Sequence, residues 1–135
     1  MSKDDKTAGK TSGDPSAQGT LFHNPRCSKS RGALELLTER GVRPEIVRYL
    51  DQPPKPAELR EILRLLGLPA RSLLRTGEAE YRDLKLDDPS LDDDALIEAM
   101  SRHPRLIERP IFVRGDRAVI GRPPERVLEL LTPKG

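Results

Sequence analysis

The hydrophobic positions in the first third of the chain form two short apolar runs with a helical pattern between them. The run around Leu21–Phe22 predicts a strand over about residues 20–23, and a second strand is expected over residues 45–49. Between them, the apolar residues of segment 33–37 fall on one helix face, and Gly41 is placed to end that helix. A β-α-β order favours two parallel strands joined by a crossover helix.

A proline-rich segment, "DQPPKP", interrupts this pattern and introduces a helical block. Apolar positions from residue 59 to residue 66 predict a helix that begins near Pro56 and ends at Gly67. Two short helical turns follow, and "SLDDDALIEAMSRHP" predicts a helix whose acidic residues stand at its start, where the helix dipole favours them. Strands over residues 110–114 and 117–121 are expected to pair antiparallel around an Arg-Gly-Asp-Arg turn, and "PPERVLELL" predicts a last helix.

The order of elements is therefore β-α-β, a helical block, and β-β-α. This order predicts an α/β, thioredoxin-like fold, with a mixed four-stranded sheet and a helical insertion before the hairpin. Residues 1–19 contain no Val, Ile, Leu or aromatic residue, which predicts a disordered N-terminal tail. Residues 20–135 are expected to form one domain, because the chain is too short for two full cores.

Composition narrows the function classes more than the fold. The 135 residues carry a net charge of only +2, too small to argue for nucleic-acid binding. No apolar run approaches the roughly 20 residues that span a bilayer, and the N-terminus lacks the apolar segment of a signal peptide. With no export signal and one unpaired cysteine, the expected location is the reducing cytoplasm. One cysteine and two scattered histidines predict no metal site.

The single cysteine, Cys27, lies where the first predicted strand meets the first predicted helix. Free backbone N–H groups and the positive end of the helix dipole stabilise a thiolate there, so the pKa of the thiol is expected to fall. Arg26 precedes it, Arg31 follows four residues later on the same helix face, and Ser30 adds a hydroxyl. The alternative is a buried, inert cysteine that behaves as a small hydrophobe. The polar and basic neighbours favour an exposed thiolate.

The same junction is suited to a tetrahedral oxyanion. Such an anion needs several donors and compensating positive charge, and the planar fork of arginine provides both. Three arginines stand out by position: Arg75 ends the segment "RSLLR", Arg109 precedes the hairpin, and Arg122 follows it. Each could equally be an ordinary surface charge, because the chain is rich in arginine and sequence spacing cannot prove convergence.

Segments from most of the chain resemble one known family. "HNPRCSKSR", "YLDQPP", "LLRTGEAEY", "HPRLIERPI" and "IGRPPERVLELL", in this order and spacing, resemble the thioredoxin-fold arsenate reductases (the ArsC family) of the glutathione- and glutaredoxin-coupled type, over residues 20–131. The resemblance implies that Cys27 is the one catalytic cysteine. It implies an arginine trio that binds the oxyanion, on Arg75, Arg109 and Arg122. It also implies a cis bond at Arg109–Pro110 and supporting residues at His23, Asn24 and Ser30.

Together, the residues and the resemblance predict an arsenate reductase-like oxidoreductase with no bound cofactor. Arsenate, or a similar oxyanion, docks against the arginine trio, and the Cys27 thiolate attacks arsenic. Glutathione is the implied co-substrate, and glutaredoxin is the implied partner that clears the mixed disulfide. A lone thiol suits this scheme, because it cannot form an internal disulfide and must take its second thiol from outside.

Two other functions stay open on the sequence. Spx-type transcription regulators share the fold and bind RNA polymerase, and many of them carry Cys-x-x-Cys where this chain has "CSKS". The missing second cysteine excludes a local disulfide switch and, with the arginine trio, favours the enzyme. The other possibility is a glutathione-dependent thiol reductase with a different substrate. His23 also has two readings, a group that tunes the thiolate and a purely structural residue.

Overall fold

The computed structural model describes residues 18–131, and the predicted disorder of the tail concerns residues that lie almost entirely outside this range. Four strands form one sheet in the order β2-β1-β3-β4. They are β1 (Thr20–Phe22), β2 (Glu45–Val47), β3 (Ile111–Arg114) and β4 (Arg117–Ile120). β1 and β2 are parallel, whereas β1–β3 and β3–β4 are antiparallel. The predicted mixed, thioredoxin-like sheet is confirmed.

Helix α2 (Ser28–Glu39) is the crossover between the two parallel strands. Its apolar face buries Ala33 and Leu37. Past its end, Gly41 adopts the left-handed conformation, with φ +76°, that a residue without Cβ reaches at little cost. The predicted helix and its end are therefore confirmed.

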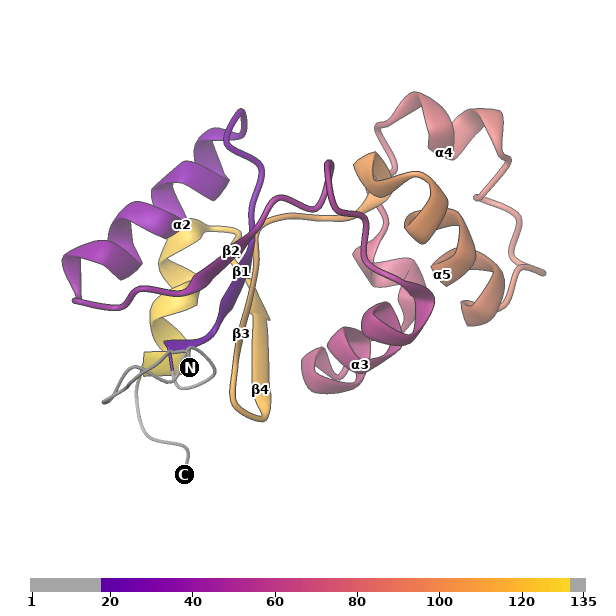
Figure 1. The fold of residues 1–135 in the computed structure, drawn as a ribbon. Coiled ribbons are helices and arrows are strands. Elements are labelled where there is room, and N and C mark those ends of the chain that lie inside the picture. Colours follow the sequence, from indigo (N-terminus) through magenta and orange to yellow (C-terminus); the bar gives the residue numbers. More distant parts are fainter. Residues whose placement is uncertain (1–17, 132–135) are drawn as a thin grey trace.

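Successive residues of the central strands face opposite sides of the sheet, and each side has its own apolar cluster. Leu21 and Phe112 point to the side covered by α2 and by η4 (Pro124–Leu131). Phe22 and Ile111 point to the side covered by the helical insertion. Figure 1 shows the two groups of helices on the two sides of the sheet. This alternation is the two-residue period of a strand buried on both faces.

The insertion before the hairpin contains three α-helices and two short 3₁₀ segments. They are α3 (Pro56–Leu66), η2 (Ala70–Leu73), α4 (Ala79–Asp83), α5 (Asp93–Arg102) and η3 (Pro104–Leu106). α3 ends at Gly67, as predicted, and the Asp92 side chain caps α5 by accepting from the Ala95 N–H at 2.9 Å. No helix in the described part of the chain is long and apolar enough to cross a membrane.

Two elements differ in detail from the prediction. The second strand ends at Val47, because the Arg48 carbonyl accepts from the Asp51 and Gln52 N–H groups, both at 2.9 Å, and turns the chain. The last helix is a 3₁₀ helix that buries Val127 and Leu130. Side chains three residues apart eclipse one another in such a helix, so this pair faces the sheet together.

Candidate functional site

Cys27 is the N-cap residue of α2, with extended backbone angles of φ −97° and ψ 123°. The loop that carries it leaves the carboxyl end of β1, beside the parallel end of β2. Its N–H donates to the Asn24 carbonyl at 3.0 Å, and its carbonyl accepts from the Arg31 N–H at 2.9 Å. The side chain is partly exposed rather than buried. This is the place and the exposure that a reactive thiol needs.

Opposing effects act on the pKa of the Cys27 thiol. Burial raises it, but the Ser30 amide, the Arg109 side chain, the Lys29 amide and the Arg109 charge all lower it, and together they outweigh burial. The amides are the free N–H groups of the first turn of α2, as the sequence predicts. The arginine is one of the predicted trio, and it comes from the other end of the chain. The net result is a lowered pKa.

We expect this lowered pKa in the pH dependence of alkylation. Because the thiolate reacts and the thiol does not, iodoacetamide should already react rapidly near neutral pH and slow only as pH falls through the lowered pKa. The midpoint should lie below the ~8.5 of an ordinary cysteine. Cys27 is the single cysteine, so no other thiol contributes. In denaturant the midpoint should return to the ordinary value, and a native midpoint at or above that value contradicts the prediction.

Three of the supporting residues meet at one buried hydroxyl. Ser30, in the first turn of α2, is fully buried. Its Oγ lies 2.7 Å from His23 Nδ1 and accepts from the Asn24 N–H at 3.0 Å. The Asn24 side chain in turn accepts from the Arg26 N–H at 3.0 Å. These contacts fix the loop that presents Cys27.

The histidine of this loop is neutral. Burial lowers the pKa of His23, and the charges of Arg48 and Arg31 lower it further. Ser30 Oγ accepts from the Asn24 N–H, and its own proton can be donated to His23 Nδ1 when the neutral ring carries its proton on Nε2. The contacts favour the structural reading of His23.

Ser30→Ala should destabilise the protein by about 1–3 kcal/mol, because it leaves a buried N–H and a buried ring nitrogen without their partner. Urea unfolding measures the change. The matched control is Ser28→Ala at the exposed start of the same helix, which should change stability by less than about 0.5 kcal/mol. Equal effects of the two substitutions would mean that the His23–Ser30 contact contributes nothing beyond helix propensity.

Arg31 supports the loop from outside. Its Nη1 donates to the Pro25 carbonyl at 2.9 Å, and its charge acts on His23. It is not among the groups that lower the pKa of Cys27. Arg31 follows Cys27 by one helical turn, as predicted, but its side chain binds the backbone of the loop and does not act on the thiol.

Arg75 reaches the site through a pairing of two segments far apart in sequence. An isolated antiparallel bridge joins Leu74 to Ile107. Beside it, the Arg75 N–H donates to the Leu106 carbonyl and the Glu108 N–H donates to the Leu73 carbonyl, both at 2.8 Å. This bridge sets the Arg75 side chain against Glu108 and next to Arg109.

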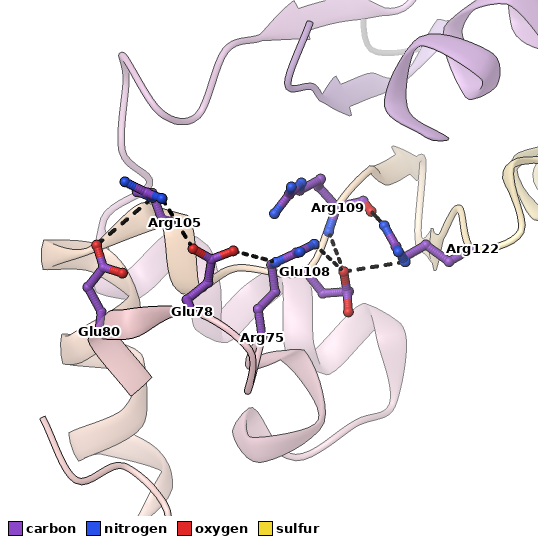
Figure 2. A network of polar contacts seen from close by, with 7 residues as sticks. All are labelled: Arg75, Glu78, Glu80, Arg105, Glu108, Arg109 and Arg122. Carbon is purple, nitrogen blue, oxygen red and sulfur yellow. Dashed lines mark hydrogen bonds and ion pairs between the residues drawn. The ribbon is translucent and has the colours of Figure 1, made fainter. Parts of the chain in front are cut away.

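Glu108 contacts the side chains of Arg75 and Arg122 and the backbone of Arg109. Its Oε1 lies 3.2 Å from Arg75 Nη1, 3.3 Å from the Arg109 backbone nitrogen and 3.5 Å from Arg122 Nε. Arg122 Nη1 also donates to the Arg109 carbonyl at 3.1 Å. Figure 2 shows the trio and Glu108 together, with Glu78 on the far side of Arg75. The sequence-predicted arginines therefore lie side by side, and Arg109 links them to Cys27.

The outer part of this network extends onto the helical insertion. Glu78 accepts from Arg75 Nε at 3.3 Å and pairs with Arg105 at 3.4 Å, and Arg105 lies 4.0 Å from Glu80 (Figure 2). Glu78 is only 18% exposed, so its contact with Arg75 is shielded from water. These contacts hold the Arg75 side chain close to Arg109 and Arg122.

Pro110 and Gly121 join the segments of two of the arginines. The Arg109–Pro110 bond is cis, as the family resemblance implies, and the Arg122–Pro123 bond, for which no prediction was made, is cis as well. The Gly121 N–H donates to the Pro110 carbonyl at 2.8 Å. A Cβ on Gly121 would lie 2.9 Å from Pro110 Cγ, closer than such atoms approach, so only glycine lets the two segments pack this way.

Two residues of the site are missing from the sequence prediction. The first is Glu108, which directly precedes Arg109. A carboxylate next to a predicted anion-binding arginine was the sequence signal that could have indicated it. Tyr49 was expected as an ordinary strand residue, but it is 1% exposed, and charges on Cys27, Arg109 and Arg75 act on it. Within residues 18–131, no group of three or more His, Cys, Asp or Glu side chains is placed to hold a metal ion.

Comparison with known proteins adds to this geometry. The ArsC family model matches residues 22–130. An arsenate reductase of Neisseria meningitidis is 51% identical over 112 residues, which is 82% of this chain and 96% of that protein. The Escherichia coli K12 protein YfgD, whose name states no activity, is 53% identical over 84% of this chain and 97% of its own length.

A solved structure agrees with the same assignment. The arsenate reductase of Vibrio cholerae superposes with a TM-score of 0.81 at 47% identity, covering 82% of this chain and 95% of that one. The match to the family model includes the segments that carry Cys27, Arg75, Arg109 and Arg122, since all four lie within residues 22–130. This chain belongs to the ArsC family.

Proposed function

We propose that this protein reduces arsenate to arsenite through Cys27, with glutathione and glutaredoxin as the reductants. One observation carries the proposal: the arginine that lowers the pKa of the thiol, Arg109, is also a member of the cluster formed with Arg75 and Arg122. The nucleophile and the anion-binding groups are thus parts of one site. The names of the relatives, which include arsenate reductases of about half identical sequence, support the choice of substrate.

Binding comes first in the proposed reaction. An arsenate dianion lies between the arginine trio and the free N–H groups at the start of α2. Glu108 holds Arg75 and Arg122 in position before the anion arrives. Preformed donors of this kind need little reorganisation when charge enters the site. Each arginine offers two parallel donors to a tetrahedral oxyanion.

The chemistry then needs two thiols and transfers two electrons. The Cys27 thiolate attacks arsenic(V) and forms an S–As bond, while one arsenate oxygen takes up protons and leaves as water. A glutathione thiol adds at arsenic, and a second oxygen takes up protons and leaves as water. The two sulfurs then form an S–S bond and their bonds to arsenic break, so arsenic keeps one electron pair, takes up a water molecule and leaves as arsenite. Cys27 is left as a mixed disulfide with glutathione, which glutaredoxin reduces by thiol–disulfide exchange.

The absence of a second cysteine explains why the reductant is external. Cys27 is the single cysteine, so no other residue of the chain can resolve its oxidised form. A small thiol must therefore approach the partly exposed sulfur. The scheme requires a reducing compartment, and we place it in the cytoplasm on the grounds given by the sequence.

The test is arsenite release measured with purified protein, glutathione and glutaredoxin, with each reductant omitted in turn. We expect arsenite release above the protein-free rate only when the protein, arsenate and glutathione are all present, and multiple turnovers only when glutaredoxin is added. If the protein reduces a mixed disulfide between glutathione and another substrate but releases no arsenite, it is a thiol reductase with a different substrate. Binding to RNA polymerase without either activity would assign a regulator. Both outcomes overturn the proposal.

A further inference from the structure

Tyr49 is carried to the site by the pairing of the parallel strands. In the β1–β2 register Phe22 is opposite Val47, and the His23 N–H donates to the Val47 carbonyl at 2.9 Å. Two residues further along both chains, Tyr49 comes beside Asn24, three residues before Cys27. Tyr49 belongs to the same apolar cluster as Phe22, on the side of the sheet from which Arg75 and Arg109 approach.

The hydroxyl of Tyr49 is buried without a hydrogen-bond partner. The residue is 1% exposed, and its Oη makes no hydrogen bond among the described residues. The Asn24 side chain lies near the phenol and lowers its pKa by weak hydrogen bonding, but the two groups do not reach the distance and angles of a formed hydrogen bond. Buried tyrosine hydroxyls normally have a partner, so an unpaired one beside a reactive thiol needs an explanation.

A second unpaired atom lies in the same site. Arg109 Nε is also buried without a hydrogen-bond partner in the described structure. The Arg109 charge acts on both Tyr49 and Cys27, so its guanidinium lies near both side chains. Burial raises the pKa of Tyr49 to about 12, against smaller opposing effects of Arg109 and Arg75. The phenol therefore keeps its proton at neutral pH and can donate it.

We propose that Tyr49 is an oxyanion-contacting residue, whose buried hydroxyl donates a hydrogen bond to an oxygen of the tetrahedral anion held between Cys27 and Arg109. The proposal rests on the proposed function only in taking an oxyanion as the ligand of this site. A tetrahedral anion has several oxygens, so one oxygen can accept from Tyr49 Oη and another from Arg109 Nε. Both unpaired donors then obtain a partner at once.

Contact requires a side chain to move. Neither donor is open to solvent in this structure, so the anion reaches them when an arginine side chain shifts. Arg109 has several rotatable bonds, whereas its backbone N–H and carbonyl are held by Glu108 and Arg122. Its guanidinium can therefore turn while its main chain stays in place. An anion bonded to Cys27 is also anchored close to the phenol.

The substitution Tyr49→Phe distinguishes an anion-binding role of the hydroxyl from a structural one, because the two roles predict different changes in stability and in arsenate affinity. The ring remains and only the oxygen is lost. Because the oxygen is unpaired in the free protein, the unliganded variant should be as stable as the wild type or more stable. Because the oxygen contacts the anion, the variant should bind arsenate about tenfold more weakly. A hydroxyl with a structural role would give the opposite pair of effects, lower stability and unchanged binding.

The control is Tyr81→Phe. Tyr81 is the other tyrosine of the chain, lies on α4 and packs against the same apolar cluster, but it is only partly buried. It should change neither stability nor binding. Arsenate and sulfate binding are measured by calorimetry, stability by urea unfolding, and the pH midpoint of Cys27 alkylation is recorded for each variant.

Each outcome decides between the two proposals. Weaker anion binding by Tyr49→Phe, with stability kept and the Cys27 midpoint unchanged, supports the inference even if no arsenite is formed and the proposed function fails. Unchanged anion binding overturns it while the proposed function stands. A raised pH midpoint of Cys27 alkylation in Tyr49→Phe also overturns the inference, because the Tyr49 hydroxyl would then be a hydrogen-bond donor to the thiolate. If the wild type binds neither arsenate nor sulfate, both proposals fall.

Discussion

Replacing Cys27 by serine should abolish arsenite formation and leave the fold intact. Serine is close to cysteine in size, and it is one of the residues that N-cap positions favour, because its hydroxyl can accept from a free N–H of the first turn. Its oxygen stays protonated at neutral pH and cannot form the disulfide that returns two electrons to arsenic. The rate should therefore fall to that of glutathione and arsenate without protein. Arsenite release and urea unfolding are measured on the same preparation.

Anion binding provides the control for this substitution. The thiolate is a negative charge beside the bound oxyanion, so removing it should leave arsenate affinity equal or higher. The outcome expected for Cys27→Ser is thus binding without turnover. Arsenite release above the protein-free rate would show that the reaction does not pass through Cys27, whatever the affinity.

Arg109→Ala should weaken arsenate binding by about one to two decades and raise the pKa of Cys27 as well. The guanidinium acts on both the anion site and the thiolate, so one substitution should move both measurements. The backbone contacts of Arg109 with Glu108 and Arg122 do not involve its side chain and remain possible in the variant. Calorimetry at fixed ionic strength gives the affinity, and the pH midpoint of alkylation gives the thiol pKa.

Two further variants make this result specific. Arg109→Lys should restore the charge but not the fork of donors, so it should recover binding only in part. Arg64→Ala removes the same charge from the exposed side of α3, where its side chain is 68% exposed and paired with Glu61, and it should do little. If Arg64→Ala weakens binding as much as Arg109→Ala, the effect is one of net charge and the site assignment is wrong.

Local pattern was sufficient for most of the fold. Hydrophobic periodicity predicted the crossover helix and the two strands of the hairpin, and glycine residues predicted where α2 and α3 end. Both signals act over only a few positions of the sequence. The shortened second strand did not follow from pattern. Its end depends on the Arg48 carbonyl accepting from the turn that comes after it.

The site divides in the same way between local and distant contacts. The lowered pKa of Cys27 is partly local, because the Lys29 and Ser30 amides are neighbours in sequence. The Arg75–Glu108 contact joins residues 33 positions apart, and spacing alone gave no sign of it. The convergence of the arginines was available only through the family resemblance. Tyr49 was overlooked because its role depends on an unpaired atom, which no sequence pattern reveals.

The glutamates among the arginines determine what kind of attraction the site exerts. The cluster of Figure 2 contains four arginines and three glutamates, so its own net charge is only one positive unit. A cluster with so little net charge attracts anions weakly from a distance, so selection happens at contact, through donors that match a tetrahedron. Its affinity should therefore depend little on ionic strength, because screening acts mainly on long-range fields. Chloride, which has no oxygens to accept the forked donors, is then a poor competitor even at the concentrations found in a cell.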